Sequence, residues 1–405
     1  MAEIVQSHST DHPGIADGGR KEQLRFAARV LLDFLGPRLA NPGAETKIDE
    51  LIQPVSLQEP RINENELLEV FASVSLQREL TTKRTDYLGR FDEAAITWDV
   101  ARPWVDLRAQ EIGPPLVDRG STNPECGSRF SVLITHDIDR TTTLEPLSVL
   151  NSLANALRLR AGNWWPLTTA LSPRALIRTI ERLLDFEVSQ QIGALYFMMA
   201  GPYRFGRYSP RTDVRWRSAR AVARLVQEAR MTIGLHGSFS AKDGNSYREE
   251  KDRLQQTLAC AVTTHRNHYL RFDPTRLYSQ LERAGIQFDL SVGFINRIGF
   301  RAGCARCHRA FDLQNGRPSN VFSVPQLFMD TILQNRTPEQ ILLELHGALS
   351  HVRAVQGCVC LVFHPETFLI DSRAWPLFQN IVHMCRDLGA DLSGRLPDVN
   401  CLKCE

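Results

Sequence analysis

The chain has 405 residues, enough for one large domain or two, and its 43% hydrophobic and 23% charged content is typical of soluble globular proteins. A net charge of +2 is too small to indicate a nucleic-acid or membrane-surface partner, so small or neutral substrates fit well. The first residues lack a secretory signal pattern, and no apolar run is long enough to span a bilayer. We therefore expect a cytoplasmic protein without a membrane span.

The N-terminal third of the chain predicts an accessory region. Residues 1–20 are polar and show no periodicity, which is typical of a disordered lead-in. Amphipathic patterns at 24–35 and 63–80 predict two helices, and short extended stretches interrupted by prolines follow them. We interpret residues 21–125 as a small N-terminal α+β domain that wraps the main one.

Residues 126–398 are expected to form the main domain, followed by a cysteine-containing tail at 399–405. Strand patterns are found at 131–137, 194–200, 232–238, 265–272, 288–294, 322–328 and 358–364. Helical patterns lie between most of them, and this alternation predicts parallel strands with right-handed crossovers. About seven such units favour an α/β fold in the form of a distorted (β/α) barrel. No glycine-rich phosphate-binding pattern is present, which argues against a nucleotide-binding sheet.

The first strand of this domain ends in two carboxylates. Alternate residues of a strand share a face, so Thr135, Asp137 and Asp139 are expected to project together. A lone Asp here could simply cap the following helix. In a barrel, however, the C-terminal ends of all strands converge on one face. The other polar residues expected at those ends are His236, Ser238, Ser240, His265, Arg266, His268, Asp289, Asp330, His364 and Glu366.

This set of side chains predicts metal-assisted hydrolysis. One carboxylate and two imidazoles suit zinc or a similar divalent ion and leave an open coordination position. Such an ion lowers the pKa of a water molecule to about 7 and so supplies a nucleophile at neutral pH. A second carboxylate could act as general base, and a more distant histidine could protonate the leaving group. This combination is typical of amide or ester hydrolysis.

Over residues of about 130–395 the sequence resembles the polysaccharide deacetylases of carbohydrate esterase family 4, which have the NodB homology fold. The segments HGSFSA, RNHYLRFD, DLSVGF and IGFRAG resemble those of a bacterial subgroup of this family. Its members have an extra N-terminal domain and are associated with surface-polysaccharide biosynthesis. The resemblance implies a metal-dependent enzyme that removes acetyl groups from acetylated sugars, hence a small-molecule or oligosaccharide substrate. The segment THDID at 135–139 resembles the family motif Thr-Phe-Asp-Asp, with one residue inserted between the two aspartates. It implies that Asp137 is the base and Asp139 a metal ligand.

The second family motif implies two histidine ligands, and only one is matched. In HGSFS at 236–240, His236 stands at the first ligand position and Ser240 at the second. His268 is the expected replacement, and His265 is the alternative. The resemblance therefore implies a site of Asp139, His236 and His268, with Zn²⁺ as the expected metal.

The remaining motifs supply the acid and base partners. Arg266 matches the arginine that contacts the base. His364 ends the apolar strand CLVFH and matches the general acid. The family also has an aspartate that orients this histidine, and either Asp289 or Asp330 could fill that role.

Two other functions remain open at this point. Because Ser240 replaces a ligand, the barrel could be catalytically degenerate and bind a saccharide or a partner enzyme. The same machinery could also hydrolyse an amide C–N bond in a non-sugar substrate. The sequence leaves the sugar, the metal and the oligomeric state undetermined.

The nine cysteines form an odd set in a chain without an export signal, so we expect mostly reduced thiols. The spacing C-x-x-C-H at 304–308 matches covalent haem attachment, but that chemistry belongs to exported proteins. Cys304 and Cys307 form one C-x-x-C pair, and Cys401 and Cys404 form another. Together they could close a structural zinc site.

Overall fold

The computed structural model describes residues 17–34, 64–82, 84–86, 90–112, 130–142, 172, 174–202, 212–241 and 243–397. Within these ranges the strands are β1 (Ser131–Ile138), β2 (Ala194–Met199), β3 (Thr232–Gly237), β4 (Thr264–Asn267), β5 (Phe288–Asp289), β6 (His308–Asp312), β7 (Arg317–Ser323), β8 (Gln326–Met329) and β9 (Cys358–Phe363). They form one sheet in the order β6-β7-β5-β4-β3-β2-β1-β9-β8. Every neighbouring pair is parallel except β6 with β7.

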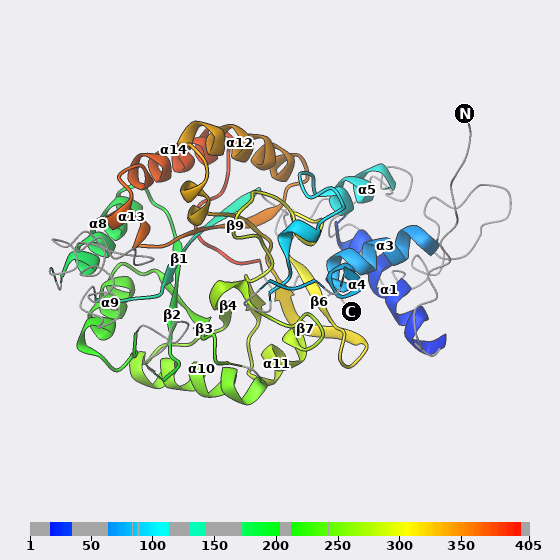
Figure 1. Ribbon diagram of the computed structural model, residues 1–405, viewed down its shortest axis with the longest axis horizontal. Helices are drawn as coiled ribbons and strands as arrows, with labels where there is room; N and C mark the ends of the chain where they lie inside the picture. The colour runs from blue at the N-terminus through cyan, green and yellow to red at the C-terminus, as the bar shows by residue number, and fades with distance from the viewer. Residues whose placement is uncertain are drawn as a thin grey trace, which may run out of the picture.

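Helices surround this curled sheet (Figure 1). The helical elements of this part are α8 (Ala175–Ser189), α9 (Arg217–Glu228), α10 (Gly244–Leu258), η4 (His268–Leu270), α11 (Leu277–Arg283), η5 (Asp330–Gln334), α12 (Pro338–Ala354), α13 (Thr367–Ile370) and α14 (Ala374–Asp387). Parallel strands require such crossovers, and the helices cover the outer face of the sheet. The predicted distorted (β/α) barrel is thus confirmed.

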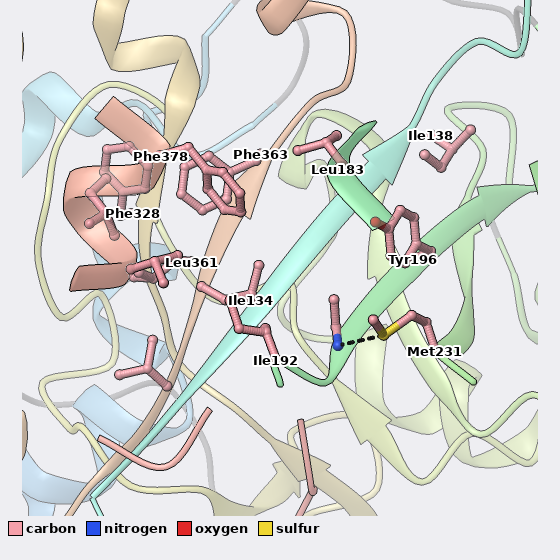
Figure 2. Packing of buried hydrophobic residues seen from close by; sticks show 14 of the residues in the cluster. Ile134, Ile138, Leu183, Ile192, Tyr196, Met231, Phe328, Leu361, Phe363 and Phe378 are labelled. Atoms are coloured by element: carbon pink, nitrogen blue, oxygen red, sulfur yellow. Dashed lines mark hydrogen bonds between the residues drawn. The ribbon is translucent and has the colours of Figure 1, made fainter. Parts of the chain in front are cut away.

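The main hydrophobic core fills the space between the sheet and the helices. Ile134 of β1 pairs in register with Leu361 of β9, and both side chains lie in this core (Figure 2). Phe363 and Phe378 pack edge to face there, with ring centroids 4.8 Å apart. Burying one such side chain contributes about 1.5–3 kcal/mol to the stability of the fold. The residues of β1 that point outward are therefore held in this core. The residues between them must point into the barrel interior, because the side chains of a strand alternate between its two faces.

The N-terminal elements lie at one side of the barrel, where α1 contacts β6 and β7 (Figure 1). They are α1 (Asp17–Phe34), α3 (Glu64–Val74), α4 (Gln77–Thr82), η2 (Glu93–Ala95) and α5 (Trp104–Ile112). Phe71 of α3 packs on Phe311 of β6, and the carboxylate of Glu79 in α4 accepts two hydrogen bonds from Arg301, at 2.6 and 2.7 Å. An isolated bridge joins Thr85 and Phe91.

The predicted domain division at residues 125 and 126 remains a prediction. The chain up to residue 16 and the tail from 398 onward lie outside the described residues. Most of the predicted lead-in and all of the cysteine tail fall there.

Three predicted strands differ from the structure, and the one predicted at 288–294 is a strand only over Phe288–Asp289. The pattern at 322–328 belongs to two strands. It includes the end of β7, which pairs with β5, and the start of β8, which pairs with β9, and the chain changes partner at Val324 and Pro325. The pattern at 265–272 ends as a strand at Asn267, because Tyr269 and Leu270 adopt left-handed backbone angles, with φ of 60° and 49°. The antiparallel hairpin of β6 and β7 was not predicted.

Candidate metal centre

Three side chains converge where β1, β3 and β4 end. Asp139 follows the last residue of β1, and its Oδ1 lies 3.2 Å from Nε2 of His236 on β3. Its Oδ2 lies 3.5 Å from Nε2 of His268, which follows β4. The potential ligand atoms all lie within 4.8 Å of one another, and among the described residues this is the group that could hold a metal ion.

The unsatisfied atoms of this cluster fit a divalent cation. Nδ1 of His236 donates to the carbonyl oxygen of Arg266 at 3.0 Å, so Nε2, which faces Asp139, is the nitrogen that could bind a cation. Nε2 of His236 and Oδ1 of Asp139 are both buried without a hydrogen-bond partner among the described residues. Buried polar atoms are costly when unpaired, and a cation bound between them would satisfy both.

The charge state of Asp139 also suits a ligand. Burial alone would raise the pKa of Asp139, but the imidazoles of His268 and His236 outweigh it and hold the pKa well below the ordinary value. The side chain therefore remains a carboxylate.

The turn that carries His268 is fixed from two sides. The imidazole packs against the ring of Tyr269, with centroids 4.0 Å apart and the ring planes tilted by 34°. The carbonyl oxygen of Tyr269 accepts a hydrogen bond from Nη1 of Arg90 at 3.3 Å, and Nη2 of Arg90 lies 2.6 Å from Oδ2 of Asp86. The N-terminal part of the chain thus supports the backbone beside His268.

A buried ion pair lies next to the cluster. Oδ1 of Asp137 accepts a hydrogen bond from Nη1 of Arg266 at 2.7 Å, and Arg266 also donates to Thr135. The predicted common face of Thr135 and Asp137 agrees with these contacts, and Asp137 and Asp139 both lie near Nε2 of His236. Burial raises the pKa of Asp137, but the charge of Arg266 outweighs it, so the pKa lies below the ordinary value. Oδ2 of Asp137 lies 3.9 Å from Nε2 of His236 and 4.0 Å from Nε2 of His364.

The two candidate aspartates have different neighbours. Oδ1 of Asp330 lies 2.7 Å from Nδ1 of His364, and its Oδ2 accepts the backbone N–H of the same residue at 2.8 Å. Asp289 lies 3.0 Å from Nδ1 of His265 and accepts from Ser291. Asp330, rather than Asp289, therefore contacts His364, and His265 contacts Asp289 rather than Asp139.

The contact with Asp330 sets the protonation of His364. Burial alone would lower the pKa of His364, but the Asp330 carboxylate outweighs it and raises the pKa to about 10. The imidazole is thus protonated at neutral pH. Its favourable contribution to folding is complete below its unfolded pKa of about 6.5 and is lost as the pH rises through about 10.

If protonated His364 serves as the acid, Asp330→Asn is expected to move the alkaline limb of kcat/KM to lower pH. The pairing that raises the pKa is lost, while the burial that lowers it remains. A pH profile of acetate release would measure this shift. Asp289→Asn is the matched control and should leave the limb in place. An unchanged profile for Asp330→Asn would contradict the role.

Ser240 does not take part in the candidate cluster. Its hydroxyl lies 3.0 Å from that of Ser238, and Ser238 donates both its backbone N–H and its hydroxyl to the buried Glu250 of α10. Glu250 was not predicted, because it lies mid-helix without a local sequence signal.

The carboxylate oxygens of Glu366 are also buried, and they lie near enough to Asp139 for the two charges to interact. Both oxygens of Glu366 lack a hydrogen-bond partner among the described residues. Burial and the negative charge of Asp139 raise the pKa of Glu366 to about 8. Its place two residues after His364 is the only signal that the sequence offers.

Cys304 and Cys307 are buried, and burial raises the pKa of both thiols well above the ordinary value. Cys401 and Cys404 lie outside the described residues, so the four-cysteine zinc site remains a prediction. None of the described helices has the length and apolar character required to cross a membrane.

The fold and the site together define a (β/α) barrel with a candidate Asp-His-His metal centre at the C-terminal ends of its strands. No protein-family model and no curated protein matches the sequence. Solved structures that align with the chain at low identity include polysaccharide deacetylases and a related pseudoenzyme.

One of these is a candidate polysaccharide deacetylase from Mycobacterium smegmatis, with 14% identity, 68% of this chain and 90% of that chain covered, and a TM-score of 0.46. The chitin deacetylase of the fungal pathogen Colletotrichum lindemuthianum has 13% identity, coverage of 68% and 88%, and a TM-score of 0.35. A carbohydrate esterase family 4 pseudoenzyme from Bacillus anthracis has 10% identity, coverage of 78% of both chains, and a TM-score of 0.35.

Proposed function

We propose that this protein is a metal-dependent hydrolase of the polysaccharide deacetylase type, which removes an acetyl group from an N-acetylated sugar or a surface-polysaccharide precursor. The observation that carries the proposal is the convergence of Asp139, His236 and His268, with unsatisfied buried atoms facing one another. Zn²⁺ is the expected metal, because mixed carboxylate and imidazole donors suit it. The cytoplasmic location remains a prediction from the sequence.

The neighbouring residues can perform the proton transfers of amide hydrolysis. A divalent cation held by the cluster would polarise the acetyl carbonyl and lower the pKa of a water molecule. Oδ1 of Asp137 is occupied by Arg266, so Oδ2 is the atom available to accept the proton of the attacking water.

Leaving-group protonation would fall to His364. Its Nδ1 is held by Asp330, which directs Nε2 toward the site, 4.0 Å from Oδ2 of Asp137. A protonated imidazole in this place can donate its Nε2 proton to the departing amine nitrogen. Base and acid are thus two separate groups, and each is fixed by its own charged partner.

A barrel that binds a saccharide or a partner without turnover is the second candidate. Ser240 occupies the position of a family ligand and hydrogen-bonds with Ser238 instead of reaching Asp139. Hydrolysis of a non-sugar amide would use the same residues and differs only in substrate.

The purified protein provides the test. We expect about one divalent ion per chain by elemental analysis, as a three-ligand site predicts. We also expect acetate release from at least some members of a panel of N-acetylated mono- and oligosaccharides. Metal without acetate release from the sugars, but with hydrolysis of simple amides, would favour the non-sugar hydrolase. Absence of both metal and turnover would reject the enzyme in favour of the binding protein.

A further inference from the structure

A pocket of about 430 Å³ lies between the N-terminal part of the chain and the barrel. Arg84 and Phe91 contribute to one wall, and Arg271, Phe272 and Arg276 contribute to the other. Neither Asp139 nor the two histidines of the candidate centre line it. It is thus a separate cavity.

The pocket opens on the same face of the barrel as the candidate metal centre. Ala241 belongs to the loop that follows β3, and Arg271 and Arg276 belong to the connection between β4 and α11. His236 lies in β3 just before the first of these connections, and His268 begins the second. Loops at the C-terminal ends of barrel strands lie together around one rim. A ligand longer than one sugar could therefore reach from the centre into this pocket.

The charges of the pocket lining favour an anion. The lining contains three arginines and two carboxylates, namely Arg84, Arg271 and Arg276 with Glu79 and Asp273. Both oxygens of Glu79 accept hydrogen bonds from buried Arg301 behind the wall, so its charge is already compensated.

The other carboxylate of the lining, that of Asp273, has only a long ion pair. Oδ2 of Asp273 lies 3.9 Å from Nε of Arg276, and its Oδ1 accepts the backbone N–H of Thr275. The side chains of Arg276 and Arg84 are 65% and 63% exposed, and Arg84 has an ion pair with Asp92 at 3.4 Å. Exposed pairs of this kind are weak, so both guanidinium groups can turn to a ligand at little cost.

Two aromatic side chains of the walls pack against a buried arginine. The guanidinium of Arg301 lies over the rings of Phe91 and Phe272, 5.6 and 4.8 Å from their centroids. A concave site with apolar walls and a few charged groups is the usual form of a small-molecule subsite. Its guanidinium groups can bind carboxylate or phosphate with paired hydrogen bonds.

We propose that this pocket is a subsite for the anionic part of an extended substrate, whose acetylated sugar lies at the metal centre. The anion would be the carboxylate of an acidic sugar or the phosphate of a sugar nucleotide. The inference rests on the proposed function for the identity of the reacting sugar, but the pocket itself can be tested by binding alone.

The experiment measures binding by titration calorimetry with the full chain, without turnover. The probes are a tetrasaccharide of alternating glucuronic acid and N-acetylglucosamine, the neutral N-acetylglucosamine tetrasaccharide, and uridine diphosphate N-acetylglucosamine. We expect at least one anionic probe to bind about ten-fold more tightly than the neutral one. Added salt should reduce this preference. The probe that binds tightly identifies carboxylate or phosphate as the anion.

The variant R84Q/R276Q should lose the preference, whereas R84K/R276K should keep most of it because the charges remain. R102Q is the matched control, since Arg102 is an exposed arginine of the same region and pairs with Asp99. Equal affinity for all three probes, or an unchanged preference in R84Q/R276Q, would overturn the subsite. An intact preference in a protein that releases no acetate would instead count against the proposed function alone.

Discussion

His236→Ala is expected to remove metal binding and acetate release together. The Nε2 atom of His236 faces Asp139 without another partner among the described residues, so its loss leaves two ligands. Even loss of a group that only orients a ligand costs about 10–100-fold in metal affinity, and loss of a ligand should cost more than about 100-fold. Elemental analysis of the purified variant and a metal-competition titration would measure the change.

His265→Ala is the control for this experiment. His265 is as buried as His236 and lies on the adjacent strand, but its Nδ1 contacts Asp289. The variant should therefore keep its metal, whatever it loses in stability. If His265→Ala lost the metal and His236→Ala retained it, the proposed ligand set would be wrong.

Asp137→Asn is expected to keep the metal and to lower kcat by about 10²–10⁴-fold, the usual contribution of a general base. The amide has the same shape as the carboxylate but cannot accept a proton at Oδ2. Because Asp137 is not a proposed ligand, metal content should remain at the parent value. Acetate release and metal content measured on the same sample would separate the two roles.

The same change should also destabilise the fold. The neutral amide that replaces the carboxylate of Asp137 would leave the buried guanidinium of Arg266 without its ion pair, and breaking such a pair costs about 3–5 kcal/mol. Urea denaturation would measure this loss. A variant with full activity, or one that loses its metal, would contradict the assignment of Asp137 as base.

The sequence by itself determined the barrel and the two acids that begin the site. Alternation along β1 predicts that Asp137 and Asp139 share a face, and the structure has both in the interior, near Arg266 and His236. This information is local, because the outward residues of β1 are held by the hydrophobic core and a strand has a period of two. Because the strands are predicted to be parallel, their C-terminal ends are also expected to meet at one face of the barrel.

Only the tertiary structure shows that His268, rather than His265, lies beside Asp139, and that Asp330, rather than Asp289, contacts His364. His268 meets Asp139 because the chain turns at Tyr269, where the backbone is left-handed and Arg90 binds the carbonyl oxygen. Such a turn depends on contacts with a distant part of the chain, and no strand pattern contains it. Asp330 contacts His364 because β8 lies beside β9 in the sheet, whereas β5 does not. Which strands become neighbours is a property of the whole sheet, and residue spacing along the chain does not record it.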